Sequence, residues 1–407
     1  MNLKKLLLSI FLISSLNVLA SDPTGSTVKF YGYVGNEFFY NSRLNQDMVD
    51  GAIFLFPKPV VLNLSGNDVN ALPQAEMLSV NTRLGVDFTG NEVLGAKTTA
   101  KIEADFAGFG TSFYVLRIRQ AYAKLNWSKT ELLIGQTWHP LFGNVAPSTP
   151  SANGGAPFQP FNRSPQLRAK QNLTKTLSVT AAALYEMQYA SIGSLGTSNV
   201  YLKNSLIPDV FVGLENKSTH WTAGIGGDIK RLKLTTGKIT SVSGVAYAQY
   251  TNKLLTIKGK GVYGQNLSDQ LMIGGYGVSN VDAATNDTTY TNFNTATGWL
   301  NVTYGSKLQV GILCGFSKNL GTDNNLLLNS AGKYIAYGYG FTAKSQSLIN
   351  QLYKIAPSIT YNITPFKISL EYDYTSAEYG TIQEKGQVAS PYNIANNRIL
   401  ASVSYIF

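Results

Sequence analysis

Apolar and polar side chains alternate in two successive runs between Leu78 and Phe106, LSVNTRLGVDFTGNEVLGAKTTAKIEADF. A period of two residues is the signature of a β-strand whose two faces meet different surroundings. The break TGNE between the runs has the composition of a turn, so the pattern predicts a β-hairpin. One face stays apolar for about a dozen residues, the length that a tilted strand needs to cross a bilayer. A soluble β-sandwich would show the same alternation, so the rest of the chain must decide.

Strand-like runs recur along the whole chain, and no helical period of 3.6 residues is sustained after the N-terminal segment. We predict strands at residues 28–40, 78–89, 94–106, 113–126, 130–138, 165–172, 176–188, 207–216, 219–230, 238–250, 253–264, 293–304, 306–317, 351–363, 366–376 and 395–407.

The connections between these strands alternate in length. Tight turns such as 90–93 and 364–365 alternate with long links such as 41–77 and 139–164. Short turns on one side and long loops on the other are typical of outer-membrane barrels, and both chain ends then belong on the short-turn side, which requires an even strand count. The strand-like run 332–343 would make seventeen, so we assign it to an extracellular hairpin. We predict an all-β fold: a single transmembrane antiparallel β-barrel of about sixteen strands, wide enough for an aqueous channel.

The N-terminus has the parts of a secretory signal peptide: Lys4 and Lys5, an apolar stretch at 6–16, and small residues before a cleavage point at Ala20. No later segment reaches the ~18 apolar residues of a membrane helix. We therefore predict a signal peptide at 1–20 and a barrel domain at 21–407. Its location would be the bacterial outer membrane, with membrane lipids as partners.

Composition excludes several functions. Charged residues make up 14% of the chain, against about 25% in ordinary globular proteins. There is one cysteine, Cys314, and there are two histidines, His139 and His220, which are far apart in the sequence. No metal-ligand spacing or nucleophile motif is present, so we expect no cofactor, no metal site, no catalytic residue and no nucleic-acid partner. Without Lys4 and Lys5 the chain has 31 basic and 23 acidic residues, a net charge of +8.

The last strand alternates apolar and polar residues and ends on Phe407. This ending resembles the C-terminal signal by which barrels are recognised for membrane insertion. We expect Tyr405 and Phe407 to act in that recognition, with the outer-membrane insertion machinery as partner. Nearby tyrosine and phenylalanine side chains would form an interfacial aromatic girdle.

A family resemblance rests on residues 78–170. The hairpin ending in EADF, then LRIRQAY, then GQTWHPLF, followed by a loop rich in glycine and proline, is similar to the DcaP-like family of Gram-negative porins. The resemblance implies a homotrimer of sixteen-stranded barrels that carry small hydrophilic, often negatively charged solutes. The chain lacks the N-terminal coiled-coil segment that some members carry. Residues 190–390 show barrel character without family motifs.

Charged residues share one face of the early strands, and we expect them to line the pore because arginine on the lipid face costs roughly 2–4 kcal/mol near mid-membrane. They are Arg83, Asp87, Lys97, Lys101, Glu103, Asp105, Arg117 and Arg119. Pairing of the strands around the 107–112 loop would place Arg117 opposite Glu103 or Lys101. The set is either a group of compensated charges that keeps the channel wet or a basic ladder that attracts anions.

The segment 139–164 carries almost no charge and several proline and glycine residues. A long loop without regular structure is often functional, and this loop is a candidate for folding inward as a constriction. We expect a porin for passive diffusion of small, hydrophilic, anionic solutes and not an enzyme. Two alternatives stay open: an outer-membrane barrel enzyme of the lipase or protease type, and a gated transporter in which 41–77 serves as the plug.

Overall fold

The computed structural model describes residues 25–108 and 115–407, so the predicted signal peptide at 1–20 lies outside the described residues. One antiparallel sheet of twenty strands contains sixteen full spans and four short additions, β4, β17, β20 and β21. The spans are β1 (Thr27–Asn41), β5 (Arg83–Val93), β6 (Ala96–Gly108), β7 (Val115–Asn126), β8 (Thr130–Trp138), β9 (Arg163–Asn172), β10 (Leu177–Leu184), β13 (Asp209–Lys217), β14 (Trp221–Leu234), β15 (Gly237–Thr251), β16 (Leu255–Gln265), β18 (Thr288–Gly305), β19 (Leu308–Thr322), β22 (Ser347–Ile363), β23 (Phe366–Ile382) and β24 (Val388–Ile406).

The sheet closes on itself as a barrel. Strand β1 pairs with β5 through its first half and with β24 through its second half, and each later span pairs with the next. Phe407 completes the closure, because its N–H and C=O exchange two hydrogen bonds of 3.1 Å with Gly32. Closure pairs the first strand with the last, which is what a bilayer requires of a spanning sheet. The prediction of a sixteen-stranded antiparallel barrel is confirmed.

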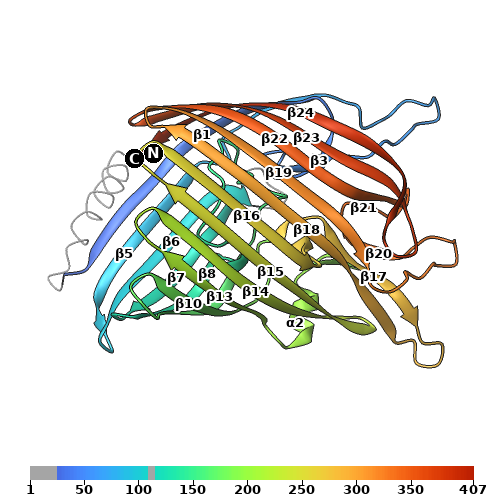
Figure 1. The fold of residues 1–407 in the computed structure, drawn as a ribbon, viewed down its shortest axis with the longest axis horizontal. Coiled ribbons are helices and arrows are strands. Elements are labelled where there is room, and N and C mark those ends of the chain that lie inside the picture. Colours follow the sequence, from blue (N-terminus) through green and yellow to red (C-terminus); the bar gives the residue numbers. More distant parts are fainter. Residues whose placement is uncertain (1–24, 109–114) are drawn as a thin grey trace, which may run out of the picture.

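The two ends of the barrel differ in the way the connection lengths predicted (Figure 1). Strand β24 finishes at the end that holds the short turns, and long loops project from the other end, which we take as extracellular. The run 332–343 supplies the short strands β20 (Ala336–Tyr339) and β21 (Phe341–Thr342). Strand β20 pairs with β17 (Gly274–Val281), and β21 pairs with β22. The run therefore extends the extracellular rim, as predicted, and does not cross the membrane.

Inner and outer faces of the wall have opposite chemistry. On β7, Leu116 and Ile118 are 61% and 56% exposed, whereas Arg119, on the opposite face, is 7% exposed. The same alternation of exposed aliphatic and buried polar residues recurs on β14, β19 and β24. The outer face is thus an apolar band suited to lipid, and the inner face is polar. Among the described residues, no helix is long and apolar enough to span a membrane.

One detail of the first predicted hairpin is wrong. Residues 78–89 do not form one strand: β4 (Gln74–Leu78) pairs with the upper part of β1, the chain leaves the sheet at 79–82, and β5 begins at Arg83. The interruption changes the phase of the alternation. Leu78 and Val80 are consequently buried inside the barrel with Phe39 and Leu400, while later even-numbered residues such as Leu84 face outward.

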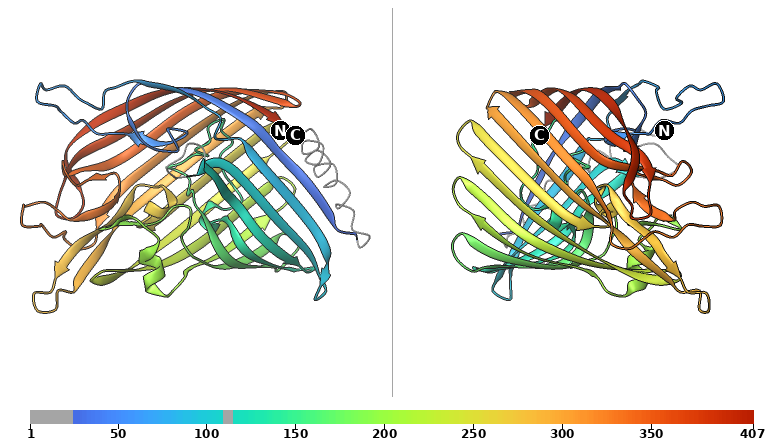
Figure 2. Two further views of the ribbon diagram at one scale, coloured as in Figure 1. Left: turned by 180° about the vertical axis from the view of Figure 1, so that it is seen from behind. Right: turned by 45° about the vertical axis from the view of Figure 1, so that its right-hand side comes forward.

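Two extracellular segments fold into the barrel and pack against each other (Figure 2). The first is the hairpin of β2 (Asn45–Met48) and β3 (Ile53–Pro57), and the second is the loop between β8 and β9, which begins with the short helix η1 (Pro140–Phe142). Together they contribute to the largest apolar cluster within residues 25–108 and 115–407, which includes Leu55 and Phe158. Four further short elements lie in extracellular loops: β11 (Ile192–Gly193), β12 (Gly196–Thr197), α2 (Val200–Ser205) and η2 (Ser268–Gln270).

Candidate pore constriction

The loop 139–162 is fixed at its base by aromatic and backbone contacts. Trp138 at the end of β8 stacks on Phe142 with ring centroids 3.9 Å apart. Gln159 donates from its amide to the carbonyl of Phe142 at 3.0 Å, which ties the returning half of the loop to the outgoing half. The abundant proline and glycine residues allow the sharp bends that bring these halves together.

The middle of the loop reaches the far wall of the barrel. Lys258 on β16 donates to the carbonyl of Ala146 and to the hydroxyl of Ser148, at 3.0 and 2.7 Å. The N–H of Ser148 donates to Asn301 on β18 at 2.9 Å, and the indole of Trp299 donates to Gln159 at 2.9 Å. These contacts place the loop inside the barrel and against the β16–β19 wall. A cavity of about 180 Å³ remains on this side, between residues 147–150 and strands β18, β19 and β22, and a larger one lies on the opposite side.

A cavity of about 340 Å³ occupies that opposite side. It lies between the loop residues 146–154 and the wall formed by β1, β5, β7, β23 and β24. Two cations of the predicted charged set, Arg83 and Arg119, line it, together with Lys367 and several serine residues. An aqueous path past the loop would therefore run along this charged wall.

Seven of the eight predicted pore-lining residues meet in one network of ion pairs and hydrogen bonds. Arg117 binds Asp105 with two hydrogen bonds of 2.8 Å, and Arg119 bridges Glu103 and Asp105 at 2.7 Å each. Arg83 is 3.8 Å from Glu103. The pairs that hold Asp105 are almost completely buried, so they fix the positions of the guanidinium groups more than they stabilise the fold.

The lower end of the network is more open. Lys101 pairs with Asp87 at 2.9 Å and donates to the hydroxyl of Tyr31 at the same distance. Tyr31 in turn donates to Glu103 at 3.0 Å and so joins the two parts of the network. Lys97, the eighth predicted residue, is exposed four residues further down β6 and makes no ion pair among the described residues.

The expected partner of Arg117 is wrong. The register places Arg117 opposite Asp105, and Glu103 lies opposite Gln120. The paired strands extend to Gly108 and Val115, beyond the limits assumed for the 107–112 loop, and irregularities at 103–104 and 105–108 shift the register by one more residue around Arg117. Bulges of this kind insert an extra residue into one strand, and a simple count of residues through the loop cannot reveal them.

Arg163, at the first position of β9, is a cation beside this network that sequence reasoning did not single out. Its side chain is fully buried, with the guanidinium carbon 4.3 Å from the centre of the Trp138 ring. It lies close enough to Arg117 and Arg119 to interact electrostatically with both. None of its three nitrogens has a hydrogen-bond partner among the described residues. The network with Arg163 holds five cations and three carboxylates, a net charge of +2.

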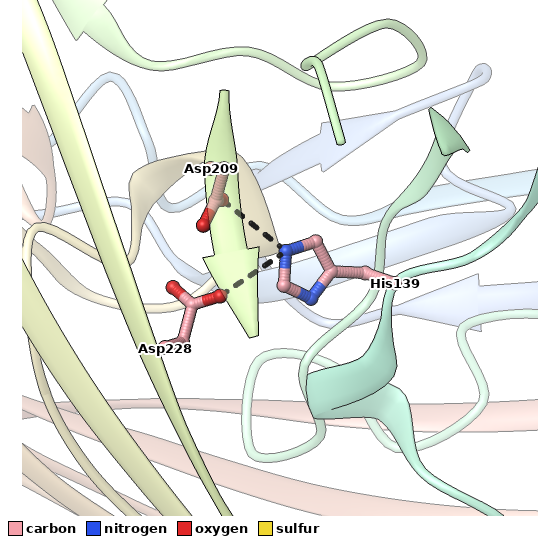
Figure 3. A group of neighbouring side chains, drawn as sticks. All are labelled: His139, Asp209 and Asp228. Atoms are coloured by element: carbon pink, nitrogen blue, oxygen red, sulfur yellow. Dashed lines mark hydrogen bonds and ion pairs between the residues drawn. The ribbon is translucent and has the colours of Figure 1, made fainter. Parts of the chain in front are cut away.

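His139 also occupies a site that the sequence did not predict (Figure 3). Its ring points between the carboxylates of Asp209 and Asp228, with Nε2 3.4 and 3.8 Å from their oxygens, and all three side chains are buried. Residues of these types can bind a metal ion. Here, however, Nδ1 accepts a hydrogen bond of 3.1 Å from the N–H of Leu141, so a neutral ring carries its proton on Nε2. Such a ring donates its Nε2 proton to the aspartates. The group is therefore better explained as a hydrogen-bonded link between the loop and the wall than as a metal site.

The two predicted insertion-signal residues lie at the periplasmic end of the closing strand. Phe407 and Tyr405 are about half exposed, and the ring of Tyr405 meets Phe366 edge-on at 5.2 Å. The structure thus places both rings on the outer surface, where an interfacial girdle lies. Their role in insertion stays a prediction.

The fold also resembles that of solved outer-membrane proteins. The outer membrane channel DcaP of Acinetobacter baumannii superimposes with a TM-score of 0.69 at 18% identity, over 95% of this chain and 99% of that chain. OmpF of Salmonella typhi, in a complex with daunomycin, gives 0.56 at 12% identity, over 95% and 99%. The trimer form of OmpT, an outer membrane protein of Vibrio cholerae, gives 0.53 at 11% identity, over 94% and 99%. No protein-family model and no curated protein matches the sequence.

At these identities the likeness establishes the fold. The chain is a sixteen-stranded β-barrel of the porin type, and its predicted place in the bacterial outer membrane is confirmed. The resemblance to DcaP-like porins, first carried by residues 78–170, extends over nearly the whole barrel.

Proposed function

We propose that the protein is a diffusion channel for small hydrophilic solutes with a modest preference for anions. The observation that carries this proposal is the position of the charged network, beside the cavity that the inward loop leaves open. Its net charge of +2 acts across a narrow space with low-dielectric walls, and such a space focuses the field on passing ions. Rings or clusters of basic side chains are the means by which pores favour anions.

The preference is modest because most of the charge is compensated. Asp105 and Glu103 bind three of the guanidinium groups, and Asp87 binds Lys101. The excess comes from Arg163 and from the long, weak contact of Arg83 with Glu103. Compensated charges and a basic ladder, the two interpretations of the charged set, therefore both apply. The ion pairs fix the positions of the charged side chains, and a small excess of positive charge acts on solutes.

Ion conduction by the purified protein in a planar bilayer tests both parts. We expect single-channel currents that scale with salt and a reversal potential of anion sign across a KCl gradient at low ionic strength. A cation-selective channel would refute the anion preference and leave the porin intact. The absence of any stepwise conductance would refute the channel itself.

A homotrimer is the proposed assembly. The hairpin 59–73 projects from the barrel and exposes Leu62, Leu64 and Leu72, of which Leu64 is fully exposed. Exposed leucines on a projecting loop are suited to contact a neighbouring copy. One of the similar structures is a trimer form. Sedimentation of the detergent-solubilised protein, with Leu64→Ser as the variant, tests this: a wild type that sediments as a monomer would refute it.

A gated transporter is the second candidate, because the hairpin 45–57 and the loop 139–162 share one apolar core inside the barrel. A substrate-operated gate would keep purified channels mostly closed until the substrate is added. Steady open currents in KCl alone favour the passive porin. We do not propose an enzyme: His139, Asp209 and Asp228 are buried, and the neighbouring hydroxyl of Ser243 donates to Asp228 at 3.5 Å and not to the histidine.

A further inference from the structure

The outer face of the β14–β15 hairpin carries three basic side chains above the apolar band. Arg231 and Lys233 alternate with the buried Leu232 and Leu234 on β14, and Lys238 is exposed at the start of β15. All three face away from the barrel interior. The hairpin turn lies at the extracellular end, with α2 and the long loops (Figure 1). We refer to Arg231, Lys233 and Lys238 as the rim cluster.

The height of the rim cluster follows from strand geometry. Trp221, which packs against Tyr250 at 5.0 Å, marks the periplasmic edge of the apolar band on this hairpin. Outward residues Ile225 and Ile229 continue the band. Ten residues separate Trp221 from Arg231, which is about 33 Å along the strand and about 25 Å along the membrane normal at a tilt near 40°. Since the apolar band of such barrels is about 25 Å tall, Arg231 lies at its upper boundary and Lys233 one step beyond.

The cluster is electrostatically unbalanced. Lys233 and Lys238 are register partners on the same face, and like charges directly opposite each other destabilise a strand pair. Among residues 25–108 and 115–407, no carboxylate forms an ion pair with any of the three. Thr288 on the neighbouring hairpin donates its N–H to the carbonyl of Thr236 at 2.6 Å. Asp287, the residue before Thr288, is therefore near the rim cluster, but it makes no ion pair with any of the three basic side chains. A bound anion would relieve this repulsion.

We propose that the rim cluster binds the phosphate of a phosphorylated lipid in the extracellular leaflet. Charge and position together select this occupant. The site faces the lipid and not the aqueous lumen, so an acyl chain below the headgroup would lie on the apolar surface of Ile229 and Val242, which are register partners. Basic residues just outside the hydrocarbon attract anionic headgroups. A free phosphate would gain the charge contacts but not the apolar ones.

The test compares lipid retention by two charge-matched variants. One variant replaces the rim cluster (Arg231→Gln, Lys233→Gln, Lys238→Gln). The control replaces three exposed lysines at the periplasmic turns (Lys175→Gln, Lys217→Gln, Lys253→Gln) and so removes the same charge from the opposite end. Full-length folded barrel is reconstituted in phosphatidylcholine nanodiscs with lipid A, and bound lipid A is counted by native mass spectrometry.

We expect the rim variant to bind lipid A at least about tenfold more weakly than the wild type, and the periplasmic control to bind it like the wild type. A dephosphorylated lipid A should bind all three proteins equally. Equal loss in both variants, or unchanged binding by the rim variant, would overturn the proposal. Full displacement of lipid A by millimolar inorganic phosphate would overturn the choice of a lipid. A changed oligomeric state of the rim variant, with unchanged lipid binding, would identify the cluster as a subunit contact instead. Neither result depends on whether the barrel conducts ions.

Discussion

Neutralising Arg83 should reduce the anion preference of the channel. Arg83 is the most exposed guanidinium of the network, with 23% of its side chain accessible, and it lines the cavity beside the loop. Its contact with Glu103 is long, at 3.8 Å, and Glu103 keeps Arg119 and Tyr31 as partners when Arg83 is replaced. Arg83→Gln therefore removes one positive charge from the wall and leaves the rest of the network in place.

The size of the effect follows from the cavity. A sphere of 340 Å³ has a radius of about 4 Å, so an ion at its centre lies about 5 Å from the guanidinium and interacts with it by about 0.8 kcal/mol in water. At 0.1 M salt, screening reduces this energy to about 0.5 kcal/mol. Loss of the charge then lowers the local anion concentration about twofold and raises that of cations about twofold, so the anion-to-cation permeability ratio falls about fivefold. At 1 M salt the same calculation gives less than about a twofold change.

Reversal potentials across a KCl gradient measure this ratio directly. The matched control is Lys97→Gln, which removes the same charge from the same wall at an exposed position outside the network. We expect a clearly smaller shift for the control at low salt. An unchanged ratio in Arg83→Gln, or equal shifts in both variants, would show that the net charge of the barrel and not this wall determines selectivity.

Three further changes have definite expected outcomes. Deleting Phe407 removes the two backbone hydrogen bonds with Gly32. The deletion should lower the yield of folded barrel, measured by heat-modifiable migration on a gel, while the remaining folded barrels conduct normally. A normal yield with altered conductance would contradict this. Burial alone would raise the pKa of Asp68, but two backbone N–H donors and an arginine partner at 2.7 Å lower it. The stabilisation of the hairpin 59–73 is then present above the ordinary carboxyl range and is lost as the pH falls through the lowered value. Pepsin should therefore cleave the wild type there more slowly than Asp68→Asn, and the difference between the two should disappear only in that acid range. A β-carbon at Gly315 would lie 2.6 Å from the ring of Phe158, so Gly315→Ala should displace the inward loop and raise single-channel conductance; unchanged conductance would show that the loop does not limit the current.

Much of the barrel could be predicted from the sequence, because its determinants are local. The alternation of apolar and polar residues defines each strand, and the difference between short turns and long links defines the two ends. The terminal strand and the assignment of 332–343 to the rim followed from these two patterns alone. The face of Arg117 and Arg119 also followed, since period two separates them from Leu116 and Ile118.

The tertiary structure decided which of these residues meet. The register of β6 with β7, which starts at Gly108 and Val115, placed Arg117 opposite Asp105 and not Glu103, and the break at 79–82 turned Leu78 inward. Arg163 lies over Trp138, its register partner in the β8–β9 pair, and His139 meets carboxylates of β13 and β14 that are far away in the sequence. Periodicity gives the direction of a side chain from its own strand, but a contact depends on register, bulges and the path of long loops. Those features are set by the packing of the whole barrel, and so only the folded structure could show where its charge is left unbalanced.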